Sequence, residues 1–130
     1  MIVRLLWSIG AVVAGFAAVV ALSLGTDWVL HAVHYFPPES QGLHDPVQNA
    51  VALAYRSLFT VMGGWIAARL APSRPMVHTG VLSVLGLAGG TAGVIATWDL
   101  NLGPHWYPIA LAVEAIPLTL LGGWLASRRR

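Results

Sequence analysis

Four long apolar stretches dominate the sequence. They are roughly residues 3–25, 47–70, 76–97 and 105–126. Each is long enough, at about 1.5 Å per helical residue, to cross a bilayer core of about 30 Å. Lipid offers no hydrogen bonds to the backbone, so such stretches cross a membrane as helices. We therefore predict an all-α protein, a four-helix transmembrane bundle that forms one domain over residues 1–130, with the lipid bilayer as its surroundings.

The composition supports this prediction. Only 9% of the 130 residues are charged, whereas a soluble domain has about a quarter. The chain has no cysteine, which removes disulfides and thiolate metal sites from consideration. Helix punctuation lies between the stretches. Asp45-Pro46 is typical of a helix start, Gly103-Pro104 precedes the fourth stretch, and residues 26–46 are expected to form an outer loop.

Charge is distributed unevenly between the two ends of this four-pass arrangement. The arginines at one end are Arg4, Arg69, Arg74, Arg128, Arg129 and Arg130, and the acids at the other end are Asp27, Glu39, Asp45 and Asp99. Basic residues favour the cytoplasmic side. We therefore predict that both termini are cytoplasmic and that the protein lies in a bacterial inner membrane. The arginines are interpreted as topology anchors, so nucleic acid is not predicted as a partner.

Two segments resemble one another. "MGGWIAAR" (62–69) ends the second apolar stretch and "LGGWLASR" (121–128) ends the fourth. This echo favours two duplicated helical hairpins in the same orientation, a parallel repeat. The alternative is that any helix ending at the inner side collects small residues, Trp and Arg. Duplication and a shared composition of helix ends both fit the sequence.

Two charged residues lie near the middle of apolar stretches, Arg56 and Glu114. Arg56 precedes Gly63 by seven residues and Glu114 precedes Gly122 by eight, so both are expected near the membrane midplane. An isolated charge at that depth costs at least about 2.5–3.5 kcal/mol. We therefore predict an Arg56–Glu114 pair inside the bundle. It would either fix how the helices meet or serve proton or substrate binding.

The stretch "TDWVLHAVHYFPP" (26–38) holds a second candidate site. If the first helix continues through it, Asp27, His31 and His34 lie on one face at i, i+4 and i+7. His105 is expected on the same side of the membrane. Imidazole and carboxylate ligands suit zinc, nickel or copper(II). Any divalent metal is predicted here, although interfacial helix capping explains the same residues. No other cofactor is predicted.

The segments "YRSLFTVMGGWIAARLAPSRPM" and "GPHWYPIALAVEAIPLTLLGGWLA" resemble a family of small four-helix membrane proteins of the bacterial inner membrane. The resemblance covers most of the chain from Thr26 onward. It implies the four-helix topology and the membrane, and it implies no activity and no site residues.

Two classes of function remain. One is a structural or accessory protein that binds a larger membrane complex or a second copy of itself. The other is a minimal oligomeric transporter or channel for a small solute, ion or proton that uses Arg56 and Glu114. The small number of polar groups in the stretches favours the first, and the intramembrane charges favour the second. An enzyme ranks third, because no nucleophile or phosphate-binding motif is present.

Overall fold

The computed structural model describes residues 2–38 and 41–128. This part of the chain folds into four α-helices and contains no strand. The helices are α1 (Ile2–Ala32), α2 (Pro46–Leu70), α3 (Pro75–Thr97) and α4 (Trp106–Ser127). All four are long and apolar enough to span a membrane. The predicted all-α fold, with four helices long and apolar enough to span a membrane, is confirmed.

Helix α1 is longer than the sequence analysis predicted. It continues through residues 26–32, which had been assigned to the outer loop, and ends at Ala32. The segment after Gly25 contains no proline before Pro37, and the Thr26 hydroxyl donates to the Leu22 carbonyl at 2.8 Å, so the helix is not interrupted. At 31 residues, α1 is about 46 Å long. Asp27 consequently belongs to the helix rather than to a loop.

The predicted start of α2 is confirmed by its cap. Asp45 occupies the N-cap, and its Oδ1 accepts hydrogen bonds from the backbone N–H of Val47 at 2.8 Å and of Gln48 at 3.4 Å. Pro46 follows at the first helical position, where its missing N–H is not needed. This cap fixes where α2 begins at the loop end of the molecule.

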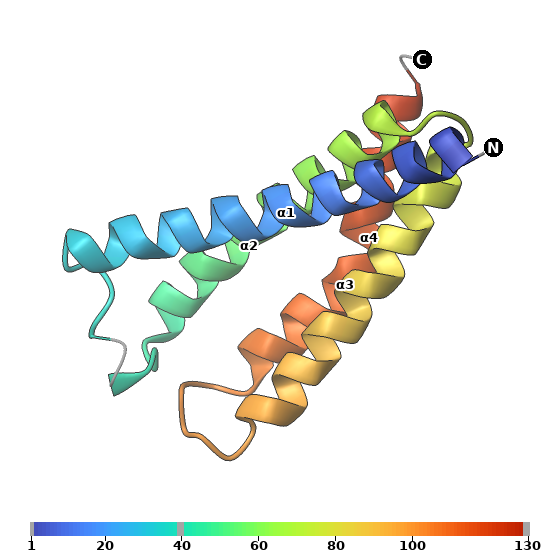
Figure 1. Cartoon of the computed structure of the whole chain (residues 1–130). Coiled ribbons are helices and arrows are strands. Elements are labelled where there is room, and N and C mark those ends of the chain that lie inside the picture. The colour runs from blue at the N-terminus through green and yellow to red at the C-terminus, as the bar shows by residue number, and fades with distance from the viewer. Residues whose placement is uncertain (1, 39–40, 129–130) are drawn as a thin grey trace.

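The helices form two antiparallel hairpins, α1–α2 and α3–α4, with both termini at one end (Figure 1). Helix α2 packs against each of the other three, whereas α1 makes no contact with α4. The helices converge at the end that carries the termini. Toward the end that carries the α1–α2 and α3–α4 loops, the two hairpins diverge (Figure 1).

Glycines hold the helices together at the converging end. A Cβ on Gly15 of α1 would lie 2.6 Å from the Gly63 carbonyl oxygen of α2, so the two backbones touch. Gly64 packs in the same way against the Thr119 carbonyl of α4, and Gly122 against the Val61 carbonyl of α2. Small residues permit this close approach of the backbones. Such packing stabilises helix association in a membrane, where lipid supplies no hydrophobic driving force. The helix backbones are therefore closely packed at these positions.

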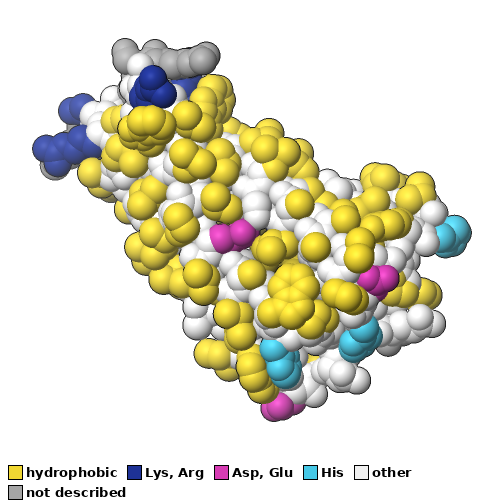
Figure 2. Space-filling model, turned by 180° about the vertical axis from the view of Figure 1, so that it is seen from behind, with side chains coloured by type: hydrophobic (Ala, Val, Ile, Leu, Met, Phe, Trp, Pro, Cys, Tyr) yellow, Lys and Arg dark blue, Asp and Glu magenta, His cyan; other side chains and the backbone are white. Residues whose placement is uncertain are grey.

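The two similar segments end their helices in the same way. Arg69 lies over the Trp65 ring at 5.3 Å, and Arg128 lies over the Trp124 ring at 4.8 Å. Each is an i, i+4 cation–π pair, which places an aromatic ring and a cation at the same end of α2 and α4. Figure 2 shows a similar distribution on the surface: arginines lie at one end, histidines and acids at the other, and mostly apolar side chains between them, with acidic atoms also midway.

The two loops touch at the diverging end. The Leu43 N–H donates to the Leu102 carbonyl at 2.5 Å. Gly42 has a φ of +71°, which glycine adopts without strain, and its α-carbon packs against Leu102. Gly103 packs in turn against the Leu43 carbonyl. The hairpins are thus joined across their loops, although their helices have separated.

Candidate functional site

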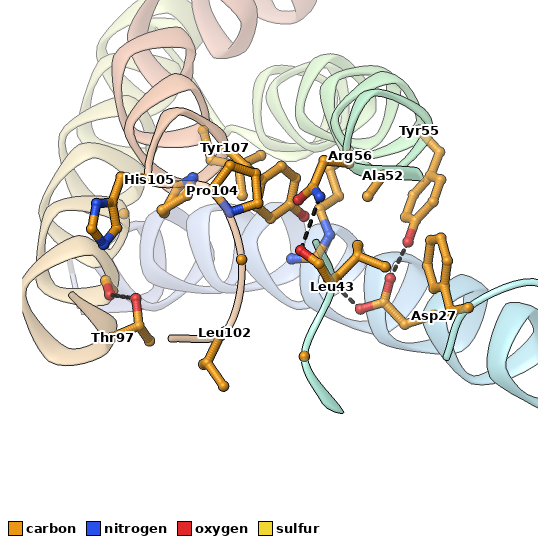
Figure 3. Close-up of a pocket in the computed structure, with 18 of the residues that line it drawn as sticks. Asp27, Leu43, Ala52, Tyr55, Arg56, Thr97, Leu102, Pro104, His105 and Tyr107 are labelled. Atoms are coloured by element: carbon orange, nitrogen blue, oxygen red, sulfur yellow. Dashed lines mark hydrogen bonds and ion pairs between the residues drawn. The ribbon is translucent and has the colours of Figure 1, made fainter. Parts of the chain in front are cut away.

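Arg56 forms its ion pair with Asp27, across α2 and α1. Its Nη2 donates to Asp27 Oδ2, and the side chains are 27% and 22% exposed respectively. The Tyr55 hydroxyl donates to Asp27 Oδ1, so both carboxylate oxygens accept a hydrogen bond (Figure 3). Arg56, Tyr55 and Asp27 form one polar cluster in the loop half of the bundle, which we call the Arg56 cluster.

The predicted Arg56–Glu114 pair is not formed in the described part of the chain. Glu114 instead accepts from the Ser57 hydroxyl, at 2.9 Å for Oε1 and 2.7 Å for Oε2. The prediction compared the depths of the two residues along their helices. An arginine side chain is long enough to carry its charge well away from its own Cα, so Arg56 reaches an acid nearer the loops.

A pocket of about 500 Å³ lies between the two diverging hairpins. All four helices and both loops contribute to its wall, and the Arg56 cluster forms one side of it (Figure 3). Tyr107 of α4 lies beside Arg56 there, and His31 and His105 add further polar groups. Much of the remaining wall is apolar, and it includes Leu111, which follows Tyr107 by one turn of α4. Pockets of this size with a few polar groups are typical of small-molecule sites.

Glycines on α3 give the pocket its room. Gly89 and Gly93 line it, and a Cβ on either would meet no atom within 4 Å. Gly90 has the opposite role, because a Cβ there would lie 2.8 Å from the Cα of Ala112. The sequence of α3 is rich in glycine, with Gly86, Gly89, Gly90 and Gly93 within two turns. In the structure it both brings α4 close and leaves one wall of the pocket bare.

Asn49 shapes the mouth of the pocket. It is 1% exposed, and its side-chain amide donates to the carbonyls of Leu43 at 3.0 Å and Asp45 at 2.9 Å. These bonds tie the end of the α1–α2 loop to the first turn of α2. Sequence reasoning missed Asn49, although a polar residue near the start of an apolar helix is a signal that could have found it.

Three of the predicted metal ligands, Asp27, His31 and His105, line the pocket, but they do not form a metal site. His34 has a φ of +63° and lies beyond the end of α1, so it leaves the helical face shared by Asp27 and His31. His105 stacks on Trp98 with the ring centroids 3.7 Å apart, and its Nε2 lies 2.9 Å from the Trp98 carbonyl oxygen. Across the described residues, no group of three His, Cys, Asp or Glu side chains could hold a metal ion.

Comparison with known proteins adds no further constraint. The chain matches no family model, no curated protein and no solved structure. The functional conclusion therefore rests on the pocket and the polar groups that line it.

Proposed function

We propose that this protein binds a small solute in the pocket between its hairpins, as the solute-binding step of a minimal oligomeric transporter in the bacterial inner membrane. The observation that carries the proposal is the position of the Arg56–Asp27 ion pair, which forms part of the wall of a 500 Å³ pocket. Intramembrane ionisable residues of transporters characteristically face such cavities. With the arginine-rich end in the cytoplasm, the pocket belongs to the periplasmic half.

The charges of the cluster favour a zwitterionic solute. A ligand of a single sign would bind one member of the Arg56–Asp27 pair and leave the other without a partner, which costs free energy in a desolvated site. A zwitterion offers a carboxylate to Arg56 and an ammonium group to Asp27, so it replaces the pair without leaving either charge alone. The hydroxyls of Tyr55 and Tyr107 supply additional hydrogen bonds.

The converging half of the bundle gives the site its sidedness. Backbone contacts at Gly15, Gly64 and Gly122 hold α1, α2 and α4 together in that half. A pocket in one half and close packing in the other are the features of a conformation open to one side. Passage of the solute would then require the hairpins to separate at the converging end, and a second copy of the chain would complete a path that four helices seldom enclose alone.

Cysteine accessibility tests whether water reaches the pocket. The chain has no native cysteine, so single substitutions can be labelled without background. Leu111→Cys lies in the pocket wall, and Val113→Cys, two residues away on α4, is 67% exposed on another face of the helix. A charged, membrane-impermeant maleimide applied from the periplasmic side should label Leu111→Cys far faster. Equal, slow labelling of both would refute a water-accessible pocket.

Ligand binding is tested by thermal stabilisation in detergent. Glycine, as the simplest zwitterionic amino acid, and leucine should stabilise the protein, by about 2.7 kcal/mol at a hundredfold excess over Kd. Acetate has only the carboxylate and methylamine only the ammonium group, so each should stabilise the protein far less. Arg56→Met and the pocket-filling Leu111→Trp should both abolish the effect. Equal stabilisation by acetate would refute the zwitterion proposal.

A structural or accessory role is the second candidate. The observation that favours it is the glycine-packed half of the bundle, which suits a rigid scaffold. Proteoliposome uptake distinguishes the two candidates, since accumulation of a solute that binds the pocket requires a transporter. Binding without uptake would favour the accessory role.

A further inference from the structure

A second polar group lies within the membrane-spanning region, on the seam between α2 and α4 and outside the pocket. Glu114 of α4 is partly exposed and contacts Ser57 of α2. Neither residue lines the pocket, and no ion pair to Glu114 occurs within residues 2–38 and 41–128. Figure 2 shows acidic atoms midway along the apolar surface. Charged residues in this environment are rare and are normally paired.

Hydrogen-bond counting shows that Ser57 does not satisfy Glu114. The Ser57 hydroxyl has a single proton, and its oxygen lies 2.6 Å from the Leu53 carbonyl as well as within reach of both Glu114 oxygens. A serine hydroxyl donates one hydrogen bond, whereas a carboxylate accepts about four. The carboxylate therefore keeps acceptor capacity that residues 2–38 and 41–128 do not fill.

Pro117 adds a second acceptor in the same part of α4. It lies inside α4 and has no N–H, so the Val113 carbonyl loses its usual donor one turn later. Val113 is highly exposed. Pro117 follows Glu114 at i+3 and Val113 at i+4, so it is a neighbour of both on the helix surface. This part of α4 thus has two kinds of hydrogen-bond acceptor, a carboxylate and a backbone carbonyl. A binding partner with hydrogen-bond donors would satisfy both.

The surface around these acceptors is apolar and follows both helices. The two helices that carry the Ser57–Glu114 contact also carry exposed apolar side chains, Leu58 and Trp65 on α2 and Val113 and Leu121 on α4. We call these residues, with Ser57, Glu114 and Pro117, the α2/α4 face. Its largely apolar composition suits a transmembrane helix rather than a water-soluble ligand.

The charges of the chain itself decide what kind of helix fits. Arg56 is engaged by Asp27, and the remaining six arginines lie in sequence at the converging end or its termini. A second copy of this chain would therefore bring no cation to the depth of Glu114. We propose that the α2/α4 face docks a transmembrane helix of a different protein, one that carries a lysine or arginine at mid-membrane depth. This inference does not depend on solute binding in the pocket.

The test uses a synthetic helix as the probe. A leucine-rich transmembrane peptide with one central lysine, and the same peptide with leucine in its place, are reconstituted with the labelled protein in phosphatidylcholine vesicles. Association is measured by fluorescence energy transfer. The lysine peptide should associate about fivefold to thirtyfold more strongly, the range expected for interhelical polar contacts in membranes. Glu114→Gln should remove most of this preference.

A matched variant tests whether binding requires the acid on the α2/α4 face or only an acid within the membrane. Leu85 is 46% exposed on α3, near the middle of that helix, so Leu85→Glu combined with Glu114→Gln moves the acid to another face. The proposal requires that this variant bind the lysine peptide weakly. Equal binding by it would overturn the proposal, because any intramembrane acid would then suffice. Self-association of the protein that depends on Glu114 would also overturn it, by identifying a second copy as the occupant.

Discussion

Removing Asp27 should destabilise the protein by leaving Arg56 without its partner. Breaking a buried ion pair from one side costs about 3–5 kcal/mol, whereas an exposed pair is worth at most about 1 kcal/mol. The Arg56 and Asp27 side chains are 27% and 22% exposed, between these limits. We therefore expect Asp27→Asn to lower the free energy of unfolding by about 2–3 kcal/mol.

A double-mutant cycle isolates the pair itself. Asp27→Asn and Arg56→Met should together cost less than the sum of the two single changes, because the double variant leaves no charge unpaired. The same cycle with Arg56→Met and Glu114→Gln should be additive within about 0.5 kcal/mol, since these residues have different partners. Unfolding is measured by titration with sodium dodecyl sulfate at fixed total detergent. Asp99→Asn, an exposed acid at the same end, serves as the control.

Two outcomes would refute the reasoning. Additivity of Asp27→Asn and Arg56→Met would mean that the ion pair contributes no coupling. Strong coupling between Arg56 and Glu114 would restore the pairing expected from their positions in the sequence. Tyr55→Phe gives an independent measure, because it removes one hydrogen bond to Asp27 and should cost about 1.5–3 kcal/mol if that bond reaches an ionised carboxylate.

Three further predictions concern packing, metal binding and topology. Gly64→Leu should lower the unfolding free energy by several kcal/mol, because a Cβ at position 64 would overlap the Thr119 carbonyl. A Cβ at position 10 would meet open space, so Gly10→Ala should be neutral or slightly stabilising in the same titration. Zinc titration of the protein and of a His31→Ala, His34→Ala variant should give the same binding curve, since the described residues bring no three ligands together; loss of binding in the variant would contradict this. Reporter fusions should place the C-terminus in the cytoplasm and the α1–α2 loop in the periplasm, and a periplasmic C-terminal signal would reverse the proposed orientation.

Sequence alone determined the number of helices and their approximate ends. Four apolar stretches of membrane-spanning length, separated by prolines and an Asp45 cap, leave no other fold, because the backbone within lipid must satisfy its own hydrogen bonds. The error at the end of α1 has a local cause. A polar Thr26-Asp27 pair suggested a loop, yet neither residue breaks a helix, and Asp27 is held there by contacts from α2.

The tertiary structure decided which polar groups meet. The sequence singles out Arg56 and Glu114 as charges near the middle of apolar stretches. Their pairing depends on helix rotation and side-chain reach, which no pattern in one sequence specifies. Arg56 points to α1 and Glu114 to Ser57 because α2 lies between α1 and α4 and offers them different faces. The pocket has the same origin. It exists because the glycines draw the hairpins together at one end while the helices diverge at the other, and that geometry appears only when all four helices are packed.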